Sequence, residues 1–389
     1  MRHVAFLIPT IDRIGGAEQQ VISLAVGLSH RGSKVNVIAL SGAGGDAADH
    51  LRCANIDFLS LGMRKGLVDP RGWVRLCRWV RTNRPEVVHA HLPHAALLAR
   101  WSRIVSPVRA LVDTIHSPST GGKARKLGYR ISSALPDVVT AVSCAAAGPW
   151  LASRSLIEEN LAIISNGVDI DRFRPDEEVR TAMRNELELS DEFLWIAVGR
   201  LDPVKDHATL LHAFRTLPPN ARLIIAGDGP FRNGLNTLAH RLELHDRVRL
   251  VGFDPDVRRL LRAADGFVLC SRWEGMPIAL LEASACELPS VVTDIEAARE
   301  VLQDLTANFS VRVGDSVALA SSMRNMMSLS TSKRSEIGRS ARDSVISRFS
   351  LDAALDQWEA LYDDVLATNL HPRRFGRASP SQGRTFQLQ

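Results

Sequence analysis

Residues 266–283 read GFVLCSRWEGMPIALLEA, and this stretch decides how the chain is organised. The segment 266–270 is short and apolar, as is typical of a buried strand. Pro277 follows at a position suited to the first turn of a helix, where its missing N–H needs no partner. We therefore expect a strand, a polar loop and a helix in succession. Glu274 lies in that loop, and Glu282 lies one to two turns inside the helix.

The two glutamates and the start of the helix suit a ligand that carries both a sugar and a phosphate. Free N–H groups at the N-terminus of a helix attract phosphate oxygens. Carboxylates accept hydrogen bonds from sugar hydroxyls. Gly275 and Met276 precede the helix, so their backbone N–H groups could donate to the sugar or the phosphate. Pro277 has no N–H to donate.

Length and composition favour a globular protein of two domains. The 389 residues exceed the usual size of one hydrophobic core. No apolar run approaches the roughly 20 residues that cross a bilayer, and the apolar segment 4–9 is too short for the core of a secretory signal. Five cysteines without paired spacing argue against a zinc site or a disulfide framework. We therefore expect a reducing, cytoplasmic location.

Strand-like and helix-like segments alternate along the chain. The first series of expected strands is 4–8, 34–40, 86–90, 110–115, 138–142 and 162–164, with helical patterns such as 18–31 and 94–104 between them. After Pro175 a second series follows, at 193–199, 222–226, 248–251, 266–270 and 290–293. Near-continuous apolar strands separated by helices predict parallel sheets covered on both faces. Two series predict an α/β fold of two doubly wound, Rossmann-like domains.

Turn signals place a hinge around residues 166–175, where Asn-Gly and Arg-Pro pairs occur. We therefore expect one domain over 1–168 and a second over 169–350. Residues 351–366 carry apolar side chains at helical spacing and predict an amphipathic helix. From 371 to 389 the chain is polar and aperiodic, which predicts a disordered tail. Ligands of doubly wound domains bind beyond the carboxyl ends of the strands, so we expect the site in the cleft between the domains.

Seven motifs occur in an order that resembles family 4 of the retaining glycosyltransferases with the GT-B fold. Besides 271–283 they are Gly15-Gly16-Ala17-Glu18, His89-Ala90-His91, His116, Asn166-Gly167-Val168-Asp169, the run from Val198 through His207, and Ala226-Gly227-Asp228-Gly229-Pro230. The resemblance extends from residue 1 to about 368. It implies that 1–168 is the acceptor-side domain, that 169–350 binds a UDP- or GDP-linked sugar, and that the helix at 351–368 crosses back onto the first domain.

The resemblance also implies roles for the residues nearest the reaction. Arg200 and Lys205 correspond to the pair that binds the pyrophosphate, where they would stabilise negative charge on the departing nucleotide. His116 corresponds to the active-site histidine that contacts the donor hexose, and His91 is a weaker candidate. Glu274 would accept hydrogen bonds from the sugar.

The remaining positions correspond to parts of the family's nucleotide site. Glu282 would accept from the ribose diol, Gly15 and Gly16 would lie against the phosphates, and Gly229 would border the nucleotide. Met276 and Pro277 depart from the commoner pattern of Phe and Gly. Each position also has a structural interpretation: the glycines as tight turns, the cations as surface charges, Glu274 as a cap and Glu282 as a surface residue.

Two other features have less specific interpretations. The glycine-rich segment 42–47 matches a dinucleotide fingerprint, but it follows the second strand without a clear helical pattern, so we interpret it as a flexible loop. Residues 1–168 hold 20 Lys and Arg against 11 Asp and Glu. The arginines at 71, 75, 78, 81 and 84 recur at helical spacing, with Lys123, Arg125, Lys126 and Arg130 further along. This basic face is either a solvated helix surface or a contact for an anionic membrane.

The function predicted is retaining, metal-independent transfer of a hexose-type sugar to an acceptor hydroxyl, on a glycan or lipid-linked glycan. No metal-ligand cluster, cofactor motif or carboxylate placed as a covalent nucleophile is evident, so a front-face substitution is implied. We expect a cytoplasmic enzyme, peripheral on the inner face of the membrane. One alternative is a nucleotide-sugar epimerase of the same fold. Another is a non-catalytic protein that binds sugar nucleotides or nucleic acid, although the basic face lacks a motif that reads nucleic acid.

Overall fold

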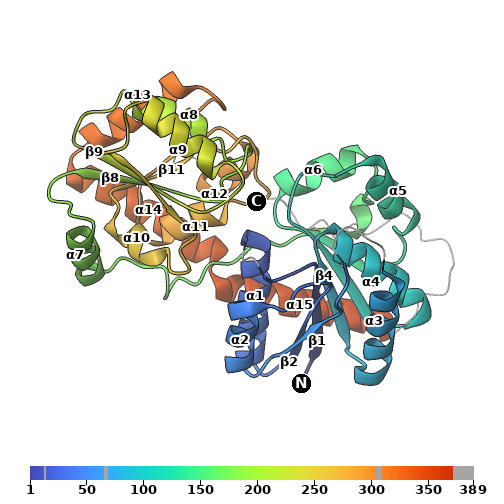
Figure 1. Cartoon of the computed structure of the whole chain (residues 1–389). Coiled ribbons are helices and arrows are strands. Elements are labelled where there is room, and N and C mark those ends of the chain that lie inside the picture. The colour runs from blue at the N-terminus through green and yellow to red at the C-terminus, as the bar shows by residue number, and fades with distance from the viewer. Residues whose placement is uncertain (13–14, 65–68, 304–308, 371–389) are drawn as a thin grey trace, which may run out of the picture. The chain divides into compact units, whose positions relative to one another are not determined.

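The computed structural model describes residues 1–12, 15–64, 69–303 and 309–370. The chain divides into two compact units, each with its own sheet (Figure 1). Unit 1 comprises residues 1–165 together with the described residues from Ala354 onward, and unit 2 comprises Asn166–Ala353. Both sheets are parallel and covered by helices, which confirms the prediction of two doubly wound α/β domains. The predicted tail at 371–389 lies outside the described residues.

Unit 1 contains a seven-stranded sheet in the order β3-β2-β1-β4-β5-β6-β7. Its strands are β1 (His3–Ile8), β2 (Lys34–Ala39), β3 (Asp57–Ser60), β4 (Val87–His91), β5 (Ala110–Ile115), β6 (Val138–Ala141) and β7 (Leu161–Ile163). Its helices are α1 (Gly16–His30), α2 (Gly45–Cys53), α3 (Pro70–Asn83), α4 (Pro93–Val105), α5 (Lys123–Ile131) and α6 (Cys144–Ala152), with a 3-10 turn at Glu158–Asn160. β3 is not among the predicted strands because this edge strand has four residues and no buried side chain.

Unit 2 contains a six-stranded sheet in the order β10-β9-β8-β11-β12-β13. Its strands are β8 (Phe193–Val198), β9 (Ala221–Ala226), β10 (Val248–Gly252), β11 (Gly266–Leu269), β12 (Ser290–Thr293) and β13 (Ser310–Val311). Its helices are α7 (Glu177–Glu186), α8 (His207–Phe214), α9 (Arg232–Arg241), α10 (Arg258–Ala263), α11 (Ile278–Ala285), α12 (Glu296–Leu302), α13 (Ser316–Ser328) and α14 (Thr331–Phe349). β13 was not predicted either, because it has only two residues.

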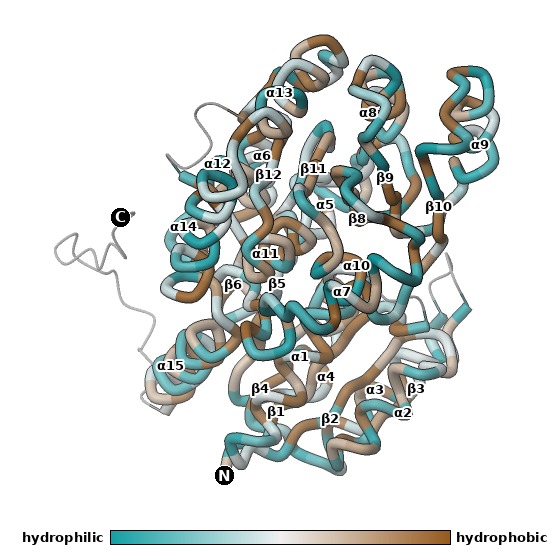
Figure 2. Tube along the Cα trace, turned by 90° about the vertical axis from the view of Figure 1, so that its left-hand side faces the viewer, coloured by the Kyte–Doolittle hydropathy of each residue, from teal (hydrophilic) through white to brown (hydrophobic). Residues whose placement is uncertain are grey.

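The two sheets share one arrangement that positions the functional loops. In unit 1 the strand order reverses between β1 and β4, and in unit 2 it reverses between β8 and β11. Loops that leave neighbouring strands at such a point diverge to opposite faces of the sheet and open a crevice for a ligand. The strands themselves are apolar, as the brown traces of β2 and β9 show in Figure 2. This apolar core leaves the strand ends as the natural place for polar chemistry.

The last helix, α15 (Leu351–Leu370), packs on unit 1 (Figure 1). Leu355, Trp358 and Tyr362 recur at helical spacing and are almost completely buried. Gly27 of α1 gives Leu355 room, because a Cβ on this glycine would lie 2.5 Å from Leu355 Cδ1. At the rim of this contact Arg2 Nη2 lies 2.5 Å from Asp363 Oδ1. Apolar packing therefore holds α15 to unit 1, with ion pairs at its edge.

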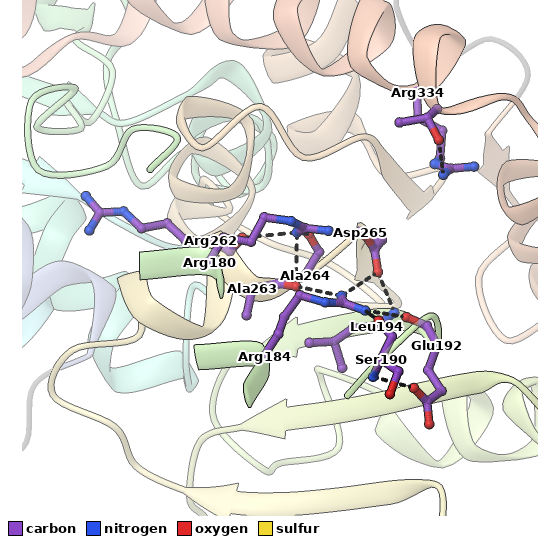
Figure 3. Close-up of polar contacts among 11 residues, drawn as sticks. Arg180, Arg184, Ser190, Glu192, Leu194, Arg262, Ala263, Ala264, Asp265 and Arg334 are labelled. Carbon is purple, nitrogen blue, oxygen red and sulfur yellow. Dashed lines mark hydrogen bonds and ion pairs between the residues drawn. The ribbon is translucent and has the colours of Figure 1, made fainter. Parts of the chain in front are cut away.

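Arginines of α7 fix this helix to the end of α10 within unit 2. Figure 3 shows Arg180 and Arg184 directed toward Asp265 and the last carbonyls of α10. Arg180 Nη1 donates to the carbonyls of Ala263 and Ala264 at 3.0 and 2.6 Å, which satisfies groups that a helix end leaves unpaired. Asp265 Oδ2 accepts from Arg184 Nη1 at 3.0 Å and from the N–H at the second residue of β8 at 2.8 Å. The network ties α7, α10 and β8 together.

Two local predictions are wrong. Pro277 is not in the first turn of a helix: it is the N-cap residue of α11, with a non-helical ψ of 85°, and the helix begins at Ile278. The segment 42–47 is not a flexible loop, because α2 begins at Gly45. The N–H of Gly44 donates to Asp12 Oδ1 at 2.6 Å and anchors this turn to the loop after β1. Charged residues in α2 hide its short apolar pattern, in which only three side chains are buried.

We expect Gly227→Ala to destabilise unit 2. Gly227 has a φ of 148°, and a Cβ there would lie 1.9 Å from the carbonyl oxygen of Gly199. The loops after β8 and β9 would have to separate, at a cost of about 2–3 kcal/mol in the free energy of unfolding. Gly234→Ala on α9 is the control, because its Cβ would meet no atom within 4 Å. Urea unfolding should show a large loss only for Gly227→Ala; equal midpoints for both variants would contradict the close approach.

Candidate functional site

The loops after β8 and β11 meet in an ion pair beside the switch point of unit 2. Lys205 Nζ lies 2.5 Å from Glu274 Oε1, and Ser271 Oγ donates to the same oxygen at 2.7 Å. Only 20% of the Lys205 side chain and 12% of the Glu274 side chain are exposed. Among the described residues, Oε2 of Glu274 accepts no hydrogen bond, so it is available to a ligand hydroxyl. Two of the predicted site residues are therefore in direct contact.

Asp202 connects the second predicted cation to this pair. Arg200 Nε lies 2.8 Å from Asp202 Oδ2, while the rest of the arginine side chain is 75% exposed. Oδ1 of Asp202 accepts from the backbone N–H groups of Val204 and Lys205 at 3.1 and 3.3 Å. One carboxylate thus shapes the loop and holds Arg200 near its surface. Asp202 is not among the residues predicted from the sequence, although its place before Pro203 and between the two cations was a usable signal.

The glycines after β9 allow two loops to touch backbone to backbone. A Cβ on Gly229 would lie 2.4 Å from the carbonyl oxygen of Leu201. The N–H of Leu201 donates to the carbonyl of Asp228 at 3.0 Å. The N–H of Gly229 donates to Asp228 Oδ1 at 2.8 Å, so it is already engaged. Close packing is thus sufficient to require glycine here, and the contact of Gly229 with a nucleotide stays a prediction.

Gly275 and Met276 are both buried at the start of α11. The sulfur of Met276 accepts a hydrogen bond from the N–H of Asn166 at 3.2 Å. This contact joins the loop after β11 to the Asn166-Gly167 motif at the start of unit 2. A flexible thioether is well suited to fill such an irregular gap. The side chain of Met276 is therefore structural, whereas donation from its backbone N–H to a ligand stays a prediction.

Glu282 is a half-buried residue on α11, and its carboxyl has an unusual pKa. Burial raises the pKa of Glu282 to about 8, and the charge of Arg172 only partly opposes this rise. At neutral pH the group is therefore mostly protonated, and it can donate one hydrogen bond as well as accept others. Perturbed pKa values of this kind are frequent at functional sites. Glu282 is thus neither an ordinary surface residue nor a simple acceptor.

In unit 1, Gly15 and Gly16 lie where the loop after β1 enters α1. The N–H of Gly15 donates to Glu18 Oε2 at 3.1 Å in a capping box. Gly15 has an extended backbone with a φ of −108°, so its conformation does not itself demand glycine. Both glycines are exposed. A phosphate at this helix start would have to displace Glu18 to reach the Gly15 N–H.

Three histidines lie together at the carboxyl ends of β4 and β5. His91 Nδ1 lies 2.9 Å from His116 Nε2, and the rings of His89 and His91 lie 4.0 Å apart. His89 is completely buried, and His91 is only 1% exposed. Burial lowers the pKa of His116 to about 4, and burial followed by the neighbouring imidazoles holds the pKa values of His89 and His91 well below 6.5. All three rings are neutral at pH 7.

The described part of the chain contains neither a candidate metal-binding cluster nor a candidate membrane-spanning helix. No group of three or more His, Cys, Asp or Glu side chains in the described ranges is arranged to hold a metal ion. Among the same residues, no helix combines the length and apolar character needed to span a membrane.

Comparison with known proteins shows the family of this chain. Residues 14–172 match the family model described as Glycosyltransferase Family 4, and residues 179–344 match the model described as Glycosyl transferases group 1. EpsF of Bacillus subtilis is 30% identical over 260 residues, which span 61% of this chain and 67% of EpsF. The chain belongs to the family 4 glycosyltransferases. It is an enzyme with the GT-B fold that transfers a sugar from a nucleotide sugar.

A further relative and a solved structure extend this similarity to most of the chain. The UDP-Gal:alpha-D-GlcNAc-diphosphoundecaprenol alpha-1,3-galactosyltransferase of Escherichia coli is 26% identical over 335 residues, covering 81% of this chain and 82% of the relative. Anabaena HepE, solved in complex with UDP and glucose, superposes with a TM-score of 0.83 at 21% identity and covers 93% of this chain and all of its own. The family models and the Escherichia coli relative favour a transferase over the epimerase and the non-catalytic binding protein.

We expect the pKa of Glu282 to make stability depend on pH. A carboxyl whose pKa is raised from 4.5 to about 8 binds more protons in the folded state, so stability falls as the pH rises through this interval. Glu282→Gln removes the charge that folding disfavours, and it should raise the melting temperature at pH 9 but much less at pH 5. Glu336→Gln on the exposed face of α14 is the control, with a similar small effect at both pH values. An equal shift at pH 5 and pH 9 for Glu282→Gln would refute the raised pKa.

Proposed function

We propose that this glycosyltransferase moves a hexose-type sugar from a UDP- or GDP-linked donor to a hydroxyl of a lipid-linked glycan, with retention of configuration. The observation that carries the proposal is the contact between Lys205 and Glu274 beside the switch point of unit 2. A cation for the phosphates and an acid for the sugar are held there within one hydrogen bond of each other. Such a pair matches the two chemical parts of a nucleotide sugar.

The phosphates of the donor bind to Lys205 and Arg200. The lysine ammonium has three donors, so it can keep Glu274 and still bind a phosphate oxygen. Arg200 is held by a single bond to Asp202 and is largely exposed, so its guanidinium is free to turn toward a diphosphate. As the bond to the leaving phosphate breaks, both cations stabilise the growing negative charge. They supply the positive charge that a divalent ion supplies in other transferases.

The hydroxyls of the hexose and of the ribose bind to Glu274 and Glu282. Oε2 of Glu274 accepts from a hydroxyl of the hexose, while Oε1 stays engaged by Lys205 and Ser271. Glu282 binds the ribose diol, and its protonated form can donate to one hydroxyl and accept from the other. His116 of unit 1 contacts the hexose, as the family resemblance implies. The acids orient the donor, and the cations activate its leaving group.

The transfer step is a front-face substitution. The bond between the anomeric carbon and the phosphate oxygen breaks, and the bond to the acceptor oxygen forms on the same face. The proton of the acceptor hydroxyl goes to an oxygen of the departing phosphate. Glu274 is a poor covalent nucleophile because Lys205 neutralises the oxygen nearest to it and Ser271 adds a hydrogen bond. This arrangement supports retention without the covalent intermediate of retaining glycosidases.

A lipid-linked acceptor is supported by the relatives. The Escherichia coli enzyme acts on a GlcNAc-diphosphoundecaprenol, and a Mycobacterium tuberculosis relative is named as a phosphatidylinositol monomannoside mannosyltransferase. The latter is 32% identical over 245 residues, which span 57% of this chain. Both names describe a sugar carried on a lipid. An enzyme with such a substrate has to work at a membrane surface.

Neighbouring helices of unit 1 offer a surface of suitable chemistry, which we call the basic-apolar face. On α5, the side chains of Lys123, Leu127, Arg130 and Ile131 are exposed at helical spacing, and only Tyr129 of that helix is buried. On α4, which packs against both α3 and α5, Trp101, Ile104 and Val105 are 40%, 60% and 40% exposed. The arginines of α3 are exposed as predicted.

This composition fits an anionic membrane better than a solvated helix. Exposed apolar side chains among cations allow shallow insertion between headgroups, while each nearby cation adds roughly 1 kcal/mol of attraction. A helix surface that is only solvated does not need Leu127 and Ile131 at 58% and 64% exposure. We therefore place the enzyme peripherally on the inner, anionic face of a membrane, in the cytoplasm.

We expect Arg200→Ala and Lys205→Ala each to lower kcat by about 10²-fold or more, because each removes a charge donor from the leaving phosphate. The assay measures transfer from a panel of UDP- and GDP-sugars at saturating donor. Arg241→Ala, an exposed cation on α9 of the same unit, is the matched control and should keep wild-type turnover. Wild-type kcat for Arg200→Ala would remove this residue from the proposed mechanism.

Vesicle flotation tests the basic-apolar face. We expect the protein to float with vesicles containing anionic phospholipid, and less so at high salt, because the attraction is screened. Leu127→Asp with Ile131→Asp should reduce flotation about tenfold or more by removing the inserted side chains and adding repulsion. Val317→Asp is the matched control, since Val317 is 77% exposed on unit 2. Equal flotation of all variants would contradict the assignment of this face.

A further inference from the structure

Unit 1 contains a buried row of hydrogen bonds near the histidine that is predicted to contact the sugar. The donor and the acceptor of each bond in this row can be assigned. Thr140 Oγ1 lies 3.1 Å from the carbonyl oxygen of Asp113, which can only accept, so the Thr140 hydroxyl donates there. Thr140 has no second proton, and it must therefore accept from Thr114 Oγ1 at 2.7 Å. Thr114 in turn accepts from His89 Nε2 at 2.6 Å. The proton of neutral His89 is thus on Nε2.

The same reasoning assigns the donor in the hydrogen bond at the other end of this row. Neutral His89 with its proton on Nε2 has a bare Nδ1, so the hydroxyl of Tyr362 donates to Nδ1 at 2.7 Å. Every polar atom in this row has a partner of the right kind. His89 therefore has a single tautomer, and its ring packs against the ring of His91. A helix from the end of the chain, α15, provides the tyrosine.

His91 has only one polar contact in the described structure, and that contact is His116. Nδ1 of His91 faces Nε2 of His116 at 2.9 Å, so one of these nitrogens carries the proton. Nε2 of His91 is buried and has no hydrogen-bond partner among the described residues. If Nδ1 of His91 accepted, its own proton would have to be on this partnerless Nε2. Buried donors without a partner are rarer than buried acceptors without one, which favours the proton on Nδ1.

We propose that His91 is a positioning residue, not a sugar ligand: it donates from Nδ1 to Nε2 of His116 and thereby holds His116 with its proton on Nδ1. His116 is partly exposed, and its Nδ1 has no partner among the described residues. It therefore presents an N–H donor to an oxygen of the ligand. This inference rests on the proposed contact of His116 with the sugar, and it specifies the polarity of that contact.

The position of the proton can be measured without any substrate. In protein labelled with ¹⁵N-histidine, long-range ¹H–¹⁵N spectra at pH 7 distinguish a protonated from a bare ring nitrogen, and His116→Gln identifies the signals of His116. We expect the wild-type His116 to carry its proton on Nδ1. A proton on Nε2 of His116 in the wild type would overturn the proposal, whether or not the enzyme transfers sugar.

Two variants of His91 separate positioning from mere packing. His91→Leu removes the donor, so His116 should show a mixture of both tautomers, and kcat should fall about tenfold, as expected for one lost hydrogen bond, with donor KM within about threefold. In His91→Asn an amide N–H can take the place of the imidazole Nδ1–H, and this variant should restore the His116 tautomer and most of the turnover. A His116 tautomer unchanged in His91→Leu would overturn the proposal.

Thr114→Val is the control for a general loss of stability when the buried row of hydrogen bonds is broken. It breaks the hydrogen bond to His89. Thr114 lies opposite His91 in the register of β4 and β5, but its hydroxyl bonds neither His91 nor His116, so stability should fall while the His116 tautomer stays as in the wild type. If Thr114→Val instead shifts that tautomer, His91 is not the residue that sets it. Wild-type turnover in His116→Gln would contradict the proposed sugar contact but would leave the measured tautomer, and hence the positioning by His91, intact.

Discussion

The ion pair between Lys205 and Glu274 is the interaction on which the proposed donor site depends. Its partners come from loops that leave β8 and β11, which are neighbours in the sheet but almost seventy residues apart in sequence. A partly buried pair is costly to desolvate, and breaking it leaves a charge without compensation. The hydroxyl of Ser271 adds a second bond to Glu274 and lowers that cost. The pair thus holds the two loops together while keeping a cation and an acid within reach of one ligand.

Direct backbone contact with the loop after β9 constrains the loop after β8, which carries Arg200 and Lys205. The glycines at 227 and 229 let the loop after β9 touch the loop that carries Arg200, at distances that a side chain would forbid. Asp202 then fixes the conformation of the same loop through two backbone N–H groups. Of its two cations, Arg200 is largely exposed and Lys205 is mostly buried. A constrained loop with one exposed cation is suited to an enzyme that must release a diphosphate after each turnover.

Unit 1 uses buried polar groups in a different way. Its histidines are neutral, since burial penalises the charged imidazole, and the hydrogen bonds of His89 continue in a row through Thr114 and Thr140. Such a row has only one arrangement of protons that satisfies every member, so it specifies orientation as well as adding stability. Tyr362 closes the row from α15, which makes the last helix part of the support for the strand ends of unit 1.

The sequence alone determined the fold class, most strand positions and the family, because period-two and helical patterns are local and seven motifs occur in order. It also located the residues around Lys205 and Glu274. Tertiary structure decided what the sequence could not show. The ion pair depends on strand order, which brings the loops after β8 and β11 together, and the acidity of Glu282 depends on burial. The contacts of Asp202 and the engaged N–H of Gly229 involve residues at most three positions apart, so they depend on how each loop folds locally. His91 illustrates the reason: its partner lies 25 residues away on the next strand, and only the register of β4 against β5 makes the two rings meet.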